Sequence, residues 1–122
     1  MLYKGDVGVG LRRLVREYMS TAGHAVLVAH DGSEILGLLV GSARLDIDWE
    51  CRAALVDAVV VRETQRRRGI GRALVRQFCT WARERECSVL QVVNPNEEFF
   101  GGLGLADRKA RFWQSNLDDV RT

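Results

Sequence analysis

Apolar residues follow a helical spacing at the start of the chain and form short continuous runs after it. In the first segment charged residues alternate with apolar ones that would share one helix face, which predicts an amphipathic helix; the apolar residues are Leu11, Leu14, Val15, Tyr18 and Met19. The next two runs, 24–30 and 35–40, flank the turn signal Asp31-Gly32-Ser33 and predict a β-hairpin. Gly37 and Gly41 predict a bulge or close packing at its second strand.

The clearest pattern lies in the middle of the chain, at residues 53–86. An apolar run rich in β-branched residues, 53–61, predicts a largely buried central strand. After the loop 62–71 the pattern changes to a helical period, which predicts a long helix that packs its apolar stripe on the sheet. This stripe contains Ile70, Leu74, Phe78 and Trp81. The predicted order is therefore strand, glycine loop and helix.

Three further elements complete the predicted domain. The apolar run 88–93 predicts a strand that stops at Asn94-Pro95. Its connection through a helix makes it parallel to the central strand. A short helical turn is expected at 96–100, and a last strand is expected near 108–114.

The composition is that of an ordinary folded domain. The chain has 122 residues, of which 47% are hydrophobic and 28% charged, so one domain with a single core is expected and disorder is not. A net charge of +2 does not suggest a general nucleic-acid or membrane binder. The three cysteines form no Cys-x-x-Cys pair, so neither a disulfide framework nor a zinc site is indicated. No signal core or membrane-length apolar run is found, and we expect a cytoplasmic protein.

The loop between the central strand and the long helix has the chemistry of an anion site. The first N–H groups of a helix have no intrahelical acceptor and lie at the positive end of the helix dipole. Gly69 and Gly71 allow positive φ and close approach of a ligand. Guanidinium groups suited to phosphate surround them, at Arg66, Arg67, Arg68 and Arg72. We interpret the loop as a pyrophosphate site; the alternative is a solvated basic loop in which the glycines only form a turn.

Three kinds of nucleotide loop are distinguished by their sequences. A Walker A loop requires Gly-Lys-Ser/Thr, which is absent, and a Rossmann fingerprint requires a third glycine where Leu74 stands. The remaining pattern, Arg66-x-x-Gly69-x-Gly71 after Val59-Val60-Val61, resembles the Gln/Arg-x-x-Gly-x-Gly/Ala signature of the GNAT superfamily of acetyl-CoA-dependent N-acyltransferases. The segment Phe99-Phe100-Gly101-Gly102-Leu103-Gly104-Leu105 is similar to the family's Leu-Tyr-x-x-Leu-Gly-Phe. The resemblance spans roughly residues 23–105.

The resemblance implies a fold, an activity and a binding site. The fold would be α/β, a single GNAT-like domain over residues 1–122 with a mixed central sheet flanked by helices. The activity would be transfer of an acetyl group from acetyl-CoA to a primary amine of a small molecule or protein. The alternative is a binding module of the same fold that holds acyl-CoA without turning it over. The family's CoA-binding positions, with the pantetheine arm between two splayed strands, fall on Val59, Val60, Val61, Arg66, Arg67, Arg68, Gly69, Ile70, Gly71, Arg72 and Asn94.

Acyl transfer requires a neutral amine and a stabilised thioester oxygen. A lysine-like amine with pKa ~10.4 is neutral in only about one molecule in 2,500 at pH 7, which corresponds to roughly 4.6 kcal/mol. Asp57 is the only carboxylate in the central strand, and period-two alternation places it on the same face as Leu55 and Val59. The resemblance makes Asp57 the candidate base; the alternative is a structural carboxylate. The family's tyrosine acid is replaced by Phe100, which leaves a slower enzyme, a water acid or another donor such as Tyr18.

A short acidic segment precedes the central strand. Asp46, Asp48 and Glu50 alternate there with Ile47 and Trp49. One interpretation is an acidic lip that attracts a cationic amine. The other is a polar strand end or loop with Trp49 packing inward. A metal site is not indicated, because no histidine is nearby in the sequence.

The ends of the chain depart from the family's pattern. Family domains usually begin with a strand before the first helix, and this chain has almost no room for one. The C-terminal segment is also short for the family's final strand. Either an edge of the sheet is missing or the sequence is a fragment. A homodimer is one way to cover an exposed edge, and no nucleic-acid or membrane partner is expected.

Overall fold

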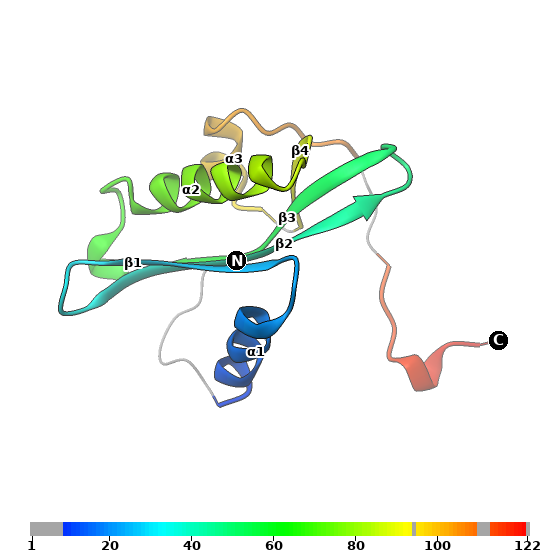
Figure 1. Ribbon diagram of the computed structural model, residues 1–122, viewed down its shortest axis with the longest axis horizontal. Coiled ribbons are helices and arrows are strands. Elements are labelled where there is room, and N and C mark those ends of the chain that lie inside the picture. The colour runs from blue at the N-terminus through cyan, green and yellow to red at the C-terminus, as the bar shows by residue number, and fades with distance from the viewer. Residues whose placement is uncertain (1–8, 94, 110–112, 122) are drawn as a thin grey trace.

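The fold is a twisted four-stranded sheet with helices on both faces (Figure 1). This computed structural model describes residues 9–93, 95–109 and 113–121, and for residues 9–11 it describes the backbone alone. The helices are α1 (Val9–Ser20), α2 (Ile70–Glu84) and α3 (Glu97–Gly102), with 3-10 turns at Glu63–Gln65 and Leu117–Asp119. The strands are β1 (His24–His30), β2 (Ile35–Asp46), β3 (Cys51–Val61) and β4 (Val89–Val92). The predicted α/β class with a mixed sheet and flanking helices is confirmed.

The strands are arranged in the order β1-β2-β3-β4. The hairpin β1–β2 and the neighbouring pair β2–β3 are antiparallel, whereas β4 runs parallel to β3 after the crossover through α2. The predicted hairpin and the predicted parallel strand at 88–93 are therefore confirmed. Strand β2 continues to Asp46, beyond the apolar run that predicted it, because its later residues pair with the first half of β3. The acidic segment thus forms the β2–β3 turn.

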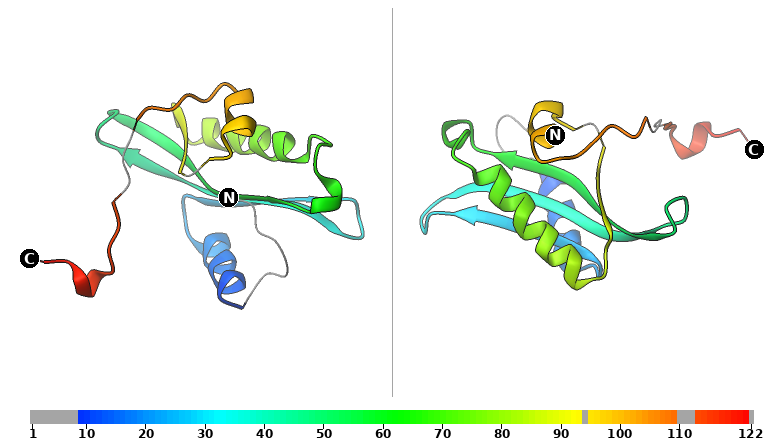
Figure 2. Two further views of the ribbon diagram at one scale, coloured as in Figure 1. Left: turned by 180° about the vertical axis from the view of Figure 1, so that it is seen from behind. Right: turned by 90° about the horizontal axis from the view of Figure 1, so that it is seen from above.

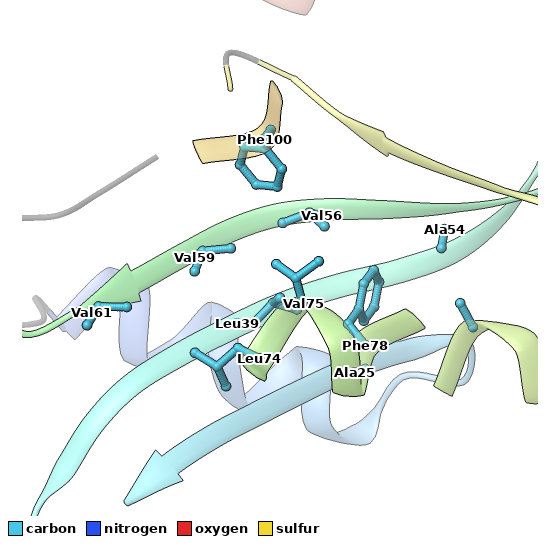
Figure 3. Close-up of a cluster of buried hydrophobic side chains, with 11 residues drawn as sticks. Ala25, Leu39, Ala54, Val56, Val59, Val61, Leu74, Val75, Phe78 and Phe100 are labelled. Atoms are coloured by element: carbon cyan, nitrogen blue, oxygen red, sulfur yellow. The ribbon is translucent and has the colours of Figure 1, made fainter. Parts of the chain in front are cut away.

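The main core lies between α2 and one face of the sheet, while α1 covers part of the opposite face (Figures 1 and 2). Figure 3 shows the side chains of α2 directed at those of β2 and β3. Phe78 is fully buried, and a Cβ on Gly41 would lie 2.5 Å from its Cζ atom. The predicted close packing at Gly41 is confirmed, because the absence of a side chain on β2 makes room for the aromatic ring.

A β-bulge interrupts the pairing of β2 and β3 at Asp57. Val40 pairs with Ala58, but Gly41 pairs with Val56, so Asp57 is the extra residue. The extra residue reverses the alternation along β3, and both Val56 and Val59 belong to the core below α2. The prediction that Asp57 shares a face with Val59 is therefore wrong. Its side chain projects to the α1 face instead, where it meets Tyr18.

Strands β3 and β4 part where the bulge begins. Their pairing runs from Ala53 opposite Val89 to Val56 opposite Val92 and ends there. β3 continues to Val61 without β4 beside it. Figure 3 shows the two strands diverging, with Phe100 of α3 between them. The splay that the family resemblance implied is present, and it starts next to Asp57.

Two expectations concerned the edges of the sheet: a strand near 108–114 and the lack of a strand before the first helix. Residues 108, 109, 113 and 114 are not in a strand, so the last strand expected near 108–114 is absent from the described part of that range. The expected lack of a first strand concerns residues that lie before the described part of the chain, and it stays an expectation. No helix in the described ranges is long and apolar enough to cross a membrane.

Candidate functional site

The arginine-rich loop is held against the end of β3 by its own side chains. The Nε atom of Arg66 donates to the carbonyl oxygen of Val61 over 3.3 Å, and Nε of Arg62 donates to the carbonyl oxygen of Ile35 over 2.5 Å. Arg66 is accordingly half-buried. These bonds tie the loop to β3 and β2 before α2 begins, so the start of the helix has a fixed place at the open end of the splay.

Gly69 forms the N-cap of α2 in a left-handed conformation, with φ of 79°. A residue with a side chain would be strained there, which is the role the sequence predicted for this glycine. No side chain of the described residues caps the helix at this end, and the first α-helical bond of the turn runs from Ala73 N–H to Gly69 O. The N–H groups of Ile70, Gly71 and Arg72 therefore have no acceptor within the helix, an arrangement that favours an anion.

Gly71 makes room for a neighbouring helix, a role that its sequence position did not suggest. Its φ is outside the left-handed region, so the expectation of positive φ is wrong for this glycine. A Cβ at this position would instead lie 3.2 Å from Cζ of Phe99 and 3.8 Å from Cγ2 of Val61. The missing side chain thus lets α3 approach the start of α2, and the two sequence motifs meet in space.

Three arginines of the loop remain exposed. Arg67 has φ of 64°, Arg72 lies in the first turn of α2, and Nη1 of Arg68 is 3.5 Å from Oε1 of Gln65. Their charges surround the N-terminus of α2, so they add to the positive potential that its dipole creates. The arrangement can bind a diphosphate through main-chain donors with guanidinium groups around it.

Asp57 lies on the face opposite the arginine-loop helix and is hydrogen-bonded to α1. The hydroxyl of Tyr18 donates to Oδ2 of Asp57 over 2.5 Å. The Tyr18 ring packs edge-on against His24 of β1, with ring centroids 4.9 Å apart and an angle of 77°. Burial, and then the hydrogen bond and charge of Asp57, raise the pKa of Tyr18 well above its ordinary value, so the phenol stays protonated.

The segment aligned with the family's tyrosine motif forms α3 and the turn after it. Asn96 caps this helix by accepting from Phe99 N–H over 3.0 Å, and Gly104 ends the turn with φ of 93°. Phe100 is buried, with 4% of its surface exposed, and belongs to the core cluster. Its ring therefore packs into the core between β3 and β4 and brings no hydroxyl there. Asn94, the other predicted CoA contact on this side, lies outside the described residues.

The acidic segment does not form one continuous lip. Asp46 is buried, and its Oδ2 accepts from Nε2 of Gln91 over 2.7 Å, while Oδ1 accepts from Trp49 N–H over 3.1 Å. Nη2 of Arg44 lies 3.6 Å from the same carboxylate and donates to Oε1 of Gln91 over 2.5 Å. These contacts, Gln91 first, hold the pKa of Asp46 below its usual range. The carboxylate is thus committed to a structural network.

The rest of that segment is open to solvent. Asp48 and Glu50 are exposed in the β2–β3 turn, and Trp49 is 51% exposed. The alternative in which Trp49 packs inward is therefore wrong. The ring of Trp49 lies 5.2 Å from the guanidinium carbon of Arg108 instead. This turn is at the end of β3 away from the arginine loop, so it is not part of the candidate anion site there (Figure 1).

Two small hollows in the surface lie away from these groups. One, of about 160 Å³, is between the end of α2 and β4 and is lined by Cys79, Arg83 and Cys87 among others. The second, of about 210 Å³, is between β1 and α2. Neither is lined by Asp57 or the loop 66–72. The candidate site is therefore separate from both hollows and lies where β3 and β4 part.

Sequence reasoning did not find the hydrogen-bond partners of Asp57 and Asp46. Tyr18 was identified only as one alternative donor, and Gln91 only as part of a strand. Both contacts join residues far apart in the chain, 39 positions for Tyr18 and Asp57 and 45 for Gln91 and Asp46. A polar residue on an otherwise apolar helix face was the one available signal for Tyr18.

The sequence and the fold were compared with those of known proteins. The sequence model of the acetyltransferase (GNAT) family matches residues 6–100. A transcriptional regulator from Bacillus halodurans C-125 is structurally similar, with a TM-score of 0.76 and 22% identity over 91% of this chain and 77% of that one. No curated protein sequence matches the chain.

Two acetyltransferase structures are similar as well. Glucosamine-6-phosphate N-acetyltransferase from Arabidopsis thaliana has a TM-score of 0.72 and 17% identity over 93% of this chain and 82% of that one. An aminoglycoside N-acetyltransferase in complex with CoA has a TM-score of 0.73 and 18% identity over 88% of this chain and 89% of that one. At these identities the structures show a common fold. Together with the match over most of the sequence, they establish that the chain belongs to the GNAT acetyltransferase family.

Proposed function

We propose that the protein is an N-acetyltransferase that transfers the acetyl group of acetyl-CoA to a primary amine of a small molecule or a protein. One observation carries the proposal. The uncapped, arginine-surrounded N-terminus of α2 lies at the outer end of the β3–β4 splay, and the exposed carboxylate of Asp57 lies at its inner end. Val61 lies four positions after Asp57 along β3, which is about 13 Å of extended chain.

In this proposal the loop binds the diphosphate of acetyl-CoA. The N–H groups of Ile70, Gly71 and Arg72 donate to phosphate oxygens, and exposed Arg67 and Arg68 neutralise their charge. The edge of β3 beyond Val56 has no strand partner among the described residues, so its main-chain groups are available to the pantetheine arm. This assigns cofactor-binding roles to Val59, Val60 and Val61 through backbone and not side chains.

The amine approaches Asp57 from the α1 face. Asp57 accepts a proton from the ammonium group, commonly through water, and the neutral amine attacks the thioester carbonyl carbon. A main-chain N–H near Val59 stabilises the oxyanion that forms. The tetrahedral intermediate then collapses with cleavage of the C–S bond, and the surplus proton on nitrogen passes through solvent to the departing CoA thiolate, leaving the amide and CoA thiol. A thiol with pKa ~8.5 is a tolerable leaving group without an acid, which accommodates Phe100 at the family's tyrosine position.

A second candidate function is binding of acyl-CoA without turnover. It is favoured by Phe100, which is buried and supplies no hydroxyl to the splay. Release of free CoA thiol separates the two functions. We expect continuous release when acetyl-CoA is mixed with a panel of primary amines, and loss of that release in Asp57→Asn. Calorimetric binding of acetyl-CoA with no thiol release from any amine would favour the binding module.

We further propose the charge of the acceptor, the cellular compartment and the oligomeric state. The acceptor is a cationic amine, since the exposed carboxylates of Asp48 and Glu50 attract positive charge. The protein acts in the cytoplasm, where its three cysteines stay reduced. A homodimer would cover an outer sheet edge, which sedimentation of the purified chain can test.

A further inference from the structure

The contact between Tyr18 and Asp57 connects α1 to the candidate base. Within the described ranges, it is the side-chain hydrogen bond that joins α1 to the sheet; the hydroxyl groups of Ser20 and Thr21 bond back to carbonyl oxygens of α1 itself. Tyr18 is in the last turns of a helix on the face opposite α2 (Figure 1). The bond therefore joins α1 to β3. The main core, which lies on the other face of the sheet against α2, does not connect these two elements.

The bulge explains why Asp57 needs such a partner. As the unpaired residue of β3, it is turned out of the ladder and its side chain is exposed. An exposed carboxylate on a bulge samples several rotamers, and each rotamer points its oxygens differently. The short bond from Tyr18 selects one of them by occupying Oδ2. Oδ1 has no hydrogen-bond partner among the described residues and is left for a proton-bearing acceptor.

Tyr18 is itself held in place. Its ring rests edge-on against His24, whose Nδ1 lies 3.2 Å from the carbonyl oxygen of Ala22 at the end of the helix. Because burial and Asp57 raise its pKa, the phenol keeps its proton across the working pH range of an acyltransferase. The Tyr18 hydroxyl resists ionisation and already donates to Asp57, so it is suited to holding that carboxylate in one orientation. For the same reasons it is poorly suited to donating its proton to the leaving thiolate.

We propose that Tyr18 is a positioning residue that orients the Asp57 carboxylate toward the acceptor amine through the Tyr18 hydroxyl. The inference rests on the proposed function of Asp57 as the base. It also decides between the roles open to Tyr18, because its hydroxyl acts on the base and not as the missing general acid. The helix α1 then forms the amine side of the site, opposite the side at which acetyl-CoA binds.

The kinetic test uses Tyr18→Phe, which keeps the ring and its packing on His24 and removes only the hydroxyl. We expect kcat/KM for the amine to fall tenfold or more, with the KM for acetyl-CoA unchanged. The split between an impaired amine reaction and an unchanged KM for acetyl-CoA is the readout, because a general folding defect would affect both substrates. His24 packs against the Tyr18 ring from β1, so His24→Gln is the control for a loss of ring packing that keeps the hydroxyl.

A second measurement tests the contact between Tyr18 and Asp57 by titration and requires no catalytic activity. The chain has two tyrosines, Tyr3 and Tyr18, so Tyr3→Phe leaves a protein in which ultraviolet absorbance reports Tyr18 ionisation alone. In that background Asp57→Asn should shift the Tyr18 titration to lower pH. An unshifted titration would overturn the proposed contact. A shifted titration with an unchanged kcat/KM for the amine in Tyr18→Phe would overturn the positioning role. A wild-type protein that acetylates no amine would overturn both that role and the proposed function, while the titration would still identify the contact.

Discussion

Gly71 at the start of α2 lies against the ring of Phe99 in α3, so close that a Cβ on the glycine would be 3.2 Å from Cζ. The glycine of the arginine loop therefore fixes where α3 sits, and through α3 it fixes Phe100 in the splay. A substitution at this position acts on two parts of the site at once. It crowds the aromatic segment, and it changes the main-chain surface offered to a diphosphate.

The first prediction compares Gly71 with Arg67. Gly71→Asp should weaken acetyl-CoA binding by tenfold or more, because it places a side chain against Phe99 and a negative charge beside the anion site. Arg67→Ala should weaken it less, since the exposed guanidinium contributes charge while the donors belong to the backbone. Isothermal titration calorimetry with acetyl-CoA measures both affinities.

A neutral variant separates the two effects at Gly71. Gly71→Ala introduces the crowding at Phe99 without the charge, and its affinity should lie between wild type and Gly71→Asp. If Gly71→Asp and Arg67→Ala both bind acetyl-CoA as tightly as the wild type, the loop is not the CoA site. A larger loss in Arg67→Ala than in Gly71→Asp would assign binding to side chains and not to the main chain.

The order of the elements could be read from the sequence because each rests on a local pattern. The β-branched run of β3, the helical stripe of α2 and the turn before β2 each specify their own structure. A bulge or close packing was predicted at Gly41 of β2, and both occur there, but no local pattern showed that the extra residue would be Asp57 of β3. One inserted residue reversed the face of Asp57, so the candidate base was found in the sequence but not its surroundings.

Gly41 offers a test of how tightly the core is packed. A Cβ on this residue would lie 2.5 Å from Cζ of Phe78 and 2.7 Å from the carbonyl oxygen of Leu55. Gly41→Ala should therefore lower the free energy of unfolding by about 1–3 kcal/mol, the usual cost of overpacking. Gly102→Ala is the matched control, because a Cβ there has nothing within 4 Å. Urea denaturation in which both variants match the wild type would contradict the packing described for β2 and α2.

The two exposed carboxylates of the β2–β3 turn test the attraction of a cationic acceptor. The double variant Asp48→Asn, Glu50→Gln should raise the KM for amines two- to fivefold at low salt and leave acetyl-CoA affinity unchanged, because exposed charges act through long-range attraction. The effect should shrink as salt is added. Steady-state kinetics at two ionic strengths measure it, and an unchanged KM at low salt would make the turn an ordinary solvated surface.

Asp46 should behave differently from its two neighbours, since its carboxylate is bonded to Gln91 and to Trp49 N–H. Its folded-state pKa is below its unfolded value, so its contribution to stability is present above the unfolded pKa and is lost as pH falls through the folded one. Asp46→Asn should lower the melting temperature at pH 7 and reduce the difference between wild type and variant as the pH falls below about 4. A pH-independent difference would contradict this account.

The last prediction concerns Asp57, on which the catalytic proposal depends. Asp57→Asn keeps the shape of the side chain and an oxygen that accepts from Tyr18, but it cannot take a proton at neutral pH. We expect kcat/KM at pH 7 to fall. The corresponding rise in activation free energy should not exceed roughly 4.6 kcal/mol, the cost of deprotonating a lysine-like amine at that pH. The loss should become smaller as the pH approaches the pKa of the free amine, because solvent then supplies the neutral form without a base.

A structural Asp57 would give the opposite pattern. Losing the charge-assisted bond to Tyr18 would lower the melting temperature, while the rate for each folded molecule and its pH dependence would stay as in the wild type. Measuring kcat/KM from about pH 6 to 10 beside a melting curve distinguishes the two. Because Asp57 is exposed and only its Oδ2 is bonded to Tyr18, we expect the melting temperature to change little and the pH profile to change strongly. A lowered melting temperature with an unchanged profile would remove Asp57 from the chemistry.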